Sequence, residues 1–137
     1  MISINDLMIL PFAILFAWVG SFLWHELSHI KSQGIKMSGT IWVDAFGMTV
    51  LPDEMKWPQL FALAGGLYSG VVYLIMSGFL FYYEAWALYI AFSTFGAINV
   101  VYGFWEWLHG PEGRFKIYGI TSILMAIFWS IYTVIYM

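Results

Sequence analysis

The chain has 137 residues, of which 62% are hydrophobic, 21% aromatic and only 9% charged, and its net charge is −3. A soluble domain usually carries about a quarter charged residues, so this composition argues against a soluble globular protein. The chain contains no cysteine, which excludes disulfides and thiolate metal sites, and it has no basic run that would support binding of nucleic acid.

Four stretches without a charged residue determine the predicted fold class. Each has 18 or more residues, and about 20 are needed to cross a bilayer core of roughly 30 Å as a helix. We therefore predict an all-α polytopic membrane protein that forms a single domain over residues 1–137. Its four transmembrane helices are expected at about 7–30, 57–82, 85–108 and 115–136. The first run has no Lys or Arg before it, so we expect a retained span rather than a signal peptide.

The connection between the first two spans contains a segment with strand character. Residues 40–50 are rich in β-branched and aromatic side chains and are bounded by Gly39 and Pro52. This pattern predicts a short β-strand or hairpin, and the alternative is an amphipathic loop on the membrane surface.

The positive charges predict the orientation of the chain in the membrane. With four crossings, the first and third connections lie on the same side, and they hold all five basic residues: Lys31, Lys36, Lys56, Arg114 and Lys116. By the positive-inside rule this side is cytoplasmic, so both termini are expected outside.

The cytoplasmic end of the first span carries an H-E-x-x-H motif formed by His25, Glu26 and His29. Residues four apart on a helix share a face, so both imidazoles can bind one metal ion, and imidazole suits zinc. Glu26 is placed to act as a general base on a water molecule that the metal activates. The alternative is a set of polar residues that simply end a span, but ionisable residues at membrane depth are costly and usually functional.

A catalytic zinc site needs a third protein ligand and leaves the fourth position to water. The candidates nearest the end of the third span are Glu106, His109 and Glu112, and others in the first connection are Asp44, Asp53 and Glu54. Asn99, Tyr102, Glu106 and His109 follow a spacing that could line one helical face, whereas Glu112 follows the helix break at Gly110-Pro111. Geometry alone does not choose among Glu106, His109 and Glu112.

The order of these motifs resembles the site-2 protease family of intramembrane zinc metalloproteases. The H-E-x-x-H helix comes first, and Gln33-Gly34-Ile35-Lys36 with the strand-like segment is similar to the family's small β-structure. Ala64-Gly65-Gly66 is similar to the family's A-G-P segment, and Asn99 to the asparagine of its N-x-x-P…D-G motif. The resemblance implies that Asn99 contacts the substrate or the developing oxyanion. Close helix packing and an interhelical hydrogen bond are the alternative explanations for these glycines and for Asn99.

The sequence also departs from the family pattern around the third ligand. Tyr102 stands where the family has proline, and no Asp-Gly pair follows Asn99. The resemblance favours Glu112 as third ligand, because Glu112-Gly113 best matches the family's Asp-Gly, with His109 second and Glu106 third. The argument from helix faces favours the latter two residues.

The predicted function is that of a zinc metalloendopeptidase that hydrolyses peptide bonds of membrane-associated substrates. His25, His29 and Glu112 would hold Zn²⁺, and Glu26 would transfer protons. The expected partners are a membrane-protein or peptide substrate and the lipid bilayer, and so short a chain is compatible with a homo-oligomer or an accessory partner. The expected location is a prokaryotic plasma membrane, with the active site toward the cytoplasm.

Two other classes of function stay open from the sequence. One is a non-catalytic zinc-binding membrane adaptor or chaperone related to the family, which the unusual third-ligand region supports. The other is a small transporter or channel component whose histidines relay ions. Against the second, no charged residue interrupts the middle of any predicted span.

Overall fold

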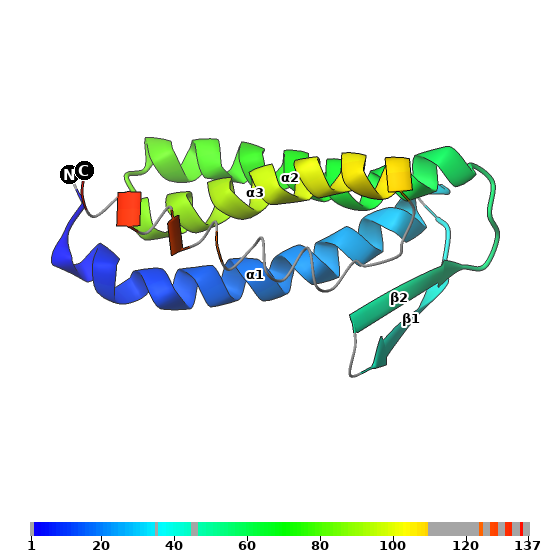
Figure 1. Ribbon diagram of the computed structural model, residues 1–137, viewed down its shortest axis with the longest axis horizontal. Helices are drawn as coiled ribbons and strands as arrows, with labels where there is room; N and C mark the ends of the chain where they lie inside the picture. Colours follow the sequence, from blue (N-terminus) through cyan, green and yellow to red (C-terminus); the bar gives the residue numbers. More distant parts are fainter. Residues whose placement is uncertain are drawn as a thin grey trace.

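The computed structural model describes residues 2–34, 36–44 and 47–109, together with residues 124, 127, 128, 131, 132 and 135. Its elements are, in chain order, α1 (Ile4–Ser32), β1 (Gly39–Asp44), β2 (Gly47–Pro52), α2 (Pro58–Tyr82) and α3 (Trp86–His109). The three helices lie side by side, and the hairpin stands at one end of the bundle (Figure 1).

The three described helices are each long and apolar enough to cross a membrane, which indicates an integral membrane protein. They confirm three of the predicted spans as long apolar helices; α1 begins three residues earlier and ends two residues later than expected (4 against 7, 32 against 30). The fourth predicted span, at 115–136, lies outside the described residues except for its six described positions, which are helical.

Local interactions determine where α1 begins and ends. At its start, the Ser3 hydroxyl accepts a hydrogen bond from the Asp6 amide at 3.2 Å, and the Asp6 carboxylate accepts one from the Ser3 amide at 2.9 Å. This capping box satisfies amide groups that a helix N-terminus leaves without intrahelical partners. Beyond its last residue, Ser32, the chain passes through Gly34 at φ +146°, a conformation that favours glycine and ends the helix.

The predicted strand segment forms an antiparallel hairpin, with β1 and β2 in register from Gly39 opposite Pro52 to Asp44 opposite Gly47. The hairpin prediction is therefore confirmed. β2 packs against α1, and Val50 on β2 is buried. Directly opposed residues of an antiparallel pair point to the same side, so Ile41, the partner of Val50, shares the face that meets the bundle.

Glycines bring α2 and α3 into close contact. A Cβ atom added to Gly66 would lie 2.3 Å from the Gly103 Cα atom, and one added to Gly103 would lie 2.8 Å from the Gly66 Cα atom. Two backbones approach this closely only where neither residue carries a side chain. The contact fixes both the rotation of α3 about its axis and its position along α2.

Gln33 joins the end of α1 to the start of α2. Its side chain is 1% exposed, and its Oε1 atom accepts hydrogen bonds from the backbone amides of Lys56 and Trp57, both at 2.8 Å. At the other end of the bundle, α2 turns into α3 through Glu84, which has a positive φ of 56°. As a result, the ends of α1 and α3 and the start of α2 meet at the end of the bundle that carries the hairpin (Figure 1).

Candidate metal centre

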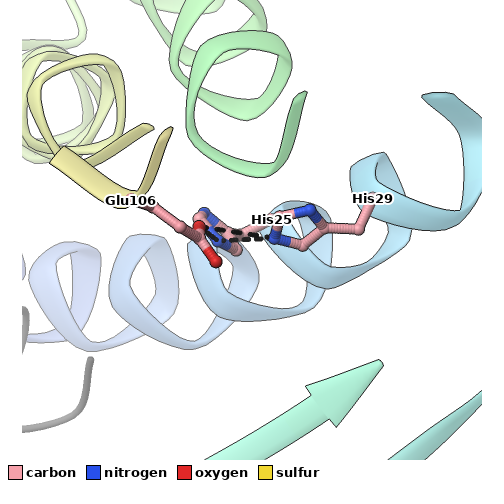
Figure 2. Close-up of side chains that lie close together, drawn as sticks. All are labelled: His25, His29 and Glu106. Carbon is pink, nitrogen blue, oxygen red and sulfur yellow. Dashed lines mark hydrogen bonds and ion pairs between the residues drawn. The ribbon is translucent and has the colours of Figure 1, made fainter. Parts of the chain in front are cut away.

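Within the described part of the chain, one group of side chains is arranged to hold a metal ion: His25 and His29 of α1 and Glu106 of α3. Figure 2 shows Glu106 reaching from α3 toward the two imidazole rings of α1. The two Nε2 atoms are 3.1 Å apart, and the Glu106 Oε2 atom lies 3.3 Å from that of His25 and 3.5 Å from that of His29. All three residues are buried, with exposed fractions of 4%, 1% and 2%.

These separations suit ligands that share one metal ion. Zinc binds nitrogen and oxygen ligands at about 2.0–2.2 Å, so two ligands at a tetrahedral angle are about 3.3 Å apart. An octahedral ion with bonds of about 2.1 Å brings neighbouring ligands to about 3.0 Å. The three observed distances, 3.1, 3.3 and 3.5 Å, are close to both values.

The hydrogen bonds on the far side of each ring assign the protons of the two imidazoles. The Nδ1 atom of His29 lies 2.6 Å from the carbonyl oxygen of Phe61, which can only accept, so Nδ1 carries the proton. The Nδ1 atom of His25 lies 3.3 Å from the Asn99 Oδ1 atom. The Asn99 amide group is oriented by its Nδ2 atom, which donates to the carbonyl of Phe95 at 2.7 Å, so Oδ1 accepts from His25.

With Nδ1 as the donor on both rings, the two Nε2 atoms present lone pairs. These lone pairs and the carboxylate oxygen of Glu106 point at one another across 3.1–3.5 Å. Three acceptors repel one another unless a cation lies between them. A cation between them, such as a metal ion, turns this repulsion into attraction.

Gly65 of α2 leaves the space that such an ion needs. A Cβ atom at this position would lie 2.2 Å from the His29 Nε2 atom and 2.7 Å from the His25 Nε2 atom. Non-bonded atoms need about 3.5 Å, so any side chain at position 65 would push against the two imidazole rings and displace them. Gly65 and its neighbour Gly66 therefore differ in role, because Gly65 faces the imidazoles and Gly66 faces α3.

Glu26 adds a second carboxylate to this end of the bundle. It follows His25 directly on α1 and is only 5% exposed. When both are ionised, Glu26 and Glu106 together carry a charge of −2, which a divalent cation balances in a medium of low dielectric constant. The donor set of two imidazoles and one carboxylate is one that zinc uses in catalytic sites.

The candidates for the third ligand end in different places. Glu106, the third choice from the sequence, is the residue that lies beside both histidines. His109 is exposed, and its ring stacks on Trp105 at a centroid distance of 4.0 Å. Glu112, the first choice from the sequence, lies outside the described residues. Asp53, in the first connection, is exposed and hydrogen-bonded to Ser38.

Three residues that support the site had no role in the sequence-based prediction. They are Ser21, which accepts a hydrogen bond from the Asn99 amide at 2.7 Å; Phe61, whose carbonyl orients His29; and Gln33, which ties α1 to α2. Ser21 lies four residues before His25 and shares its helical face, which is a signal that the sequence contains. Phe61 acts through its backbone, so no sequence pattern could have identified it.

No protein-family model, curated protein or solved structure matches the chain.

Proposed function

We propose that the chain is an intramembrane zinc metalloprotease that hydrolyses peptide bonds of membrane-associated substrates. The observation that carries this proposal is the convergence of three donors, His25 Nε2, His29 Nε2 and Glu106 Oε2, at the spacing of tetrahedral zinc ligands. Glu26, adjacent to the first ligand on the same helix, supplies the general base that peptide hydrolysis needs in addition to the metal.

The chemistry divides between the metal and the side chains. Zinc, when bound, polarises water and the scissile carbonyl as a Lewis acid. Glu26 takes a proton from the attacking water and later donates it to the leaving amine, as a general base and then a general acid. Phe61 and Asn99 keep the lone pairs of His29 and His25 directed at the metal position.

The location of the site limits the class of substrate. All three ligands are buried among helices of membrane-spanning length, so the substrate is a segment of a membrane protein or a peptide held in the bilayer. Such a segment has to unwind locally, because a helix holds its carbonyls in hydrogen bonds. The positive charges of the first and third connections support a site on the cytoplasmic side of the membrane.

The first experiment measures metal content by mass spectrometry on protein purified in detergent. We expect one zinc per chain in the wild type and none in His25→Ala or Glu106→Ala. The matched control is Glu54→Gln, which alters an exposed carboxylate of the first connection and should leave the zinc in place. A folded wild type without bound metal would remove the basis of the proposal.

The second experiment tests hydrolysis. The protein is reconstituted with a mixture of single-span peptides that carry helix-breaking residues, in water enriched in ¹⁸O. We expect new peptide ends whose carboxylates contain the heavy isotope, and we expect Glu26→Gln to keep its zinc but lose this cleavage by at least about 100-fold. Cleavage at the wild-type rate by Glu26→Gln would contradict the assigned role of Glu26.

A second candidate function is a non-catalytic zinc-binding membrane adaptor. The observation in its favour is the burial of the ligands, since none of the three is more than 4% exposed and a peptide bond therefore has little access to the site. Wild-type protein that holds one zinc per chain and cleaves none of the peptides would support this second function. A chain in which Glu26→Gln abolishes cleavage supports the first.

A further inference from the structure

We propose that Asn99 is a positioning residue for the metal ligand His25 and does not itself contact the substrate. The inference rests on the metal site of the proposed function and adds to it a specific role for the α3 asparagine. It also replaces the role that the family resemblance implies for this residue.

The side-chain amide of Asn99 forms hydrogen bonds with Ser21, Phe95 and His25. Its Nδ2 atom donates to the Ser21 hydroxyl on α1 and to the Phe95 carbonyl on α3, both at 2.7 Å. Its Oδ1 atom accepts from the Nδ1 atom of His25 at 3.3 Å. Both amide hydrogens have acceptors, so the amide cannot rotate to present its nitrogen to His25 without losing two bonds.

The burial of Asn99 argues against a role in binding the substrate. Its exposed fraction is 0%, and the side chain lies between α1 and α3. A substrate contact would require both the removal of the Ser21 and Phe95 bonds and the opening of the contact between the two helices. The same bonds are well suited to hold one imidazole in one tautomer and one orientation.

Because Asn99 and Glu106 both belong to α3, this helix provides the third ligand and also the group that orients His25. Asn99 and Glu106 are seven residues apart, which is close to two helical turns, so they lie on the same face. Glu106 provides the third ligand while Asn99 orients the first one, His25. A shift of α3 against α1 therefore changes both the ligand set and the direction of a ligand lone pair.

The direct test is the tautomer of His25 in metal-free protein, read by nitrogen NMR of ¹⁵N-histidine-labelled protein in detergent micelles at mildly alkaline pH. The chain has three histidines, so each imidazole is assigned by a single His→Gln variant. We expect His25 to carry its proton on Nδ1 in the wild type. In Asn99→Leu, which keeps the branched shape but removes the acceptor, His25 should lose this preference while His29, held by Phe61, keeps it.

A second readout is the dissociation constant for zinc, measured by competition with a chromogenic chelator. Loss of an outer partner of a ligand histidine typically weakens metal binding 10- to 100-fold, and we expect this for Asn99→Leu. Asn99→Asp should restore most of the affinity, since a protonated aspartic acid in this buried site can donate to Phe95 and still accept from His25. Thr94→Val removes a buried hydroxyl from the same helix and serves as the matched control with unchanged affinity.

The outcomes separate this inference from the proposed function. A wild-type His25 protonated on Nε2 overturns the inference without any variant, and so does a folded Asn99→Leu with wild-type tautomer and affinity. An equal loss of affinity in Thr94→Val also overturns it, because the effect would then be general to buried polar groups of α3. A protein that shows the expected tautomers but cleaves no peptide supports the positioning role and contradicts only the protease.

Discussion

Gly65→Ala tests the site with the smallest possible change. The added methyl carbon would lie 2.2 Å from the Nε2 atom of His29 and 2.7 Å from that of His25, where contacts between non-bonded atoms need about 3.5 Å. It would also lie 2.5 Å from the Cε1 atom of His29, so it meets the imidazole ring itself. Either the ring or α2 has to move, and the two Nε2 atoms then lose the spacing that a metal ion needs.

The expected effects on metal affinity and on stability differ in size. We expect zinc binding to weaken by more than about 100-fold, because loss of a residue that orients a ligand histidine already costs up to about 100-fold and here the ligand His29 itself is displaced. Overpacking costs about 1–3 kcal/mol, and alanine is favoured over glycine in a helix by about 1 kcal/mol. The metal-free variant should therefore be destabilised by only about 0–2 kcal/mol.

The assay combines metal content with the midpoint of thermal unfolding, each measured with and without zinc. A ligand at 100 times its dissociation constant stabilises the protein by about 2.7 kcal/mol, so zinc should raise the midpoint of the wild type and not that of Gly65→Ala. Gly78→Ala on the same helix is the control, because a Cβ atom there meets nothing within 4 Å. Gly65→Ala with one zinc per chain at wild-type affinity would refute the assigned ion position.

The remaining predictions concern the third ligand and the contacts that place the helices. Glu106→Gln should lose zinc by mass spectrometry while His109→Ala retains it, since Glu106 lies beside the histidines and His109 does not; the reverse result would contradict Glu106 as the ligand. Gln33→Ala should lower the free energy of unfolding by about 2–4 kcal/mol, because two backbone amides lose their acceptor, whereas Gln59→Ala at an exposed position should change it by less than about 0.5 kcal/mol. Gly66→Ala should cost about 3 kcal/mol and also weaken zinc binding, because its Cβ atom meets the α3 backbone at 2.3 Å and would displace Glu106; unaltered zinc affinity would contradict that coupling.

The ligand pair and the membrane spans illustrate what local rules can predict. Runs without charge have to be helical in lipid, because the backbone finds no other partners there, and this holds whatever the neighbouring elements do. His25 and His29 share a face because they are four residues apart on one helix, so their proximity depends on α1 alone. The hairpin follows equally from β-branched residues between Gly39 and Pro52.

The third ligand illustrates what those rules cannot predict. Glu106 and His109 lie on the same helix three residues apart, and either could have faced the histidines. The structure buries Glu106 between α1 and α3, while His109, the last residue of α3, stacks on Trp105 of its own helix. The family resemblance favoured Glu112 on motif spacing, which carries no information about how α3 is rotated.

The sequence by itself therefore determined three long apolar helices, the hairpin and the pairing of His25 with His29 on one helix, because each of these depends on residues within a few turns of one another. Only the tertiary structure decided which α3 side chain lies beside the two histidines and which groups contact the far sides of their rings. The physical reason is that the rotation and depth of α3 are fixed by the contact of Gly66 with Gly103, two residues on different helices whose packing no local sequence pattern specifies. That contact brings Glu106 to the histidines and Asn99 to the outer side of one of them.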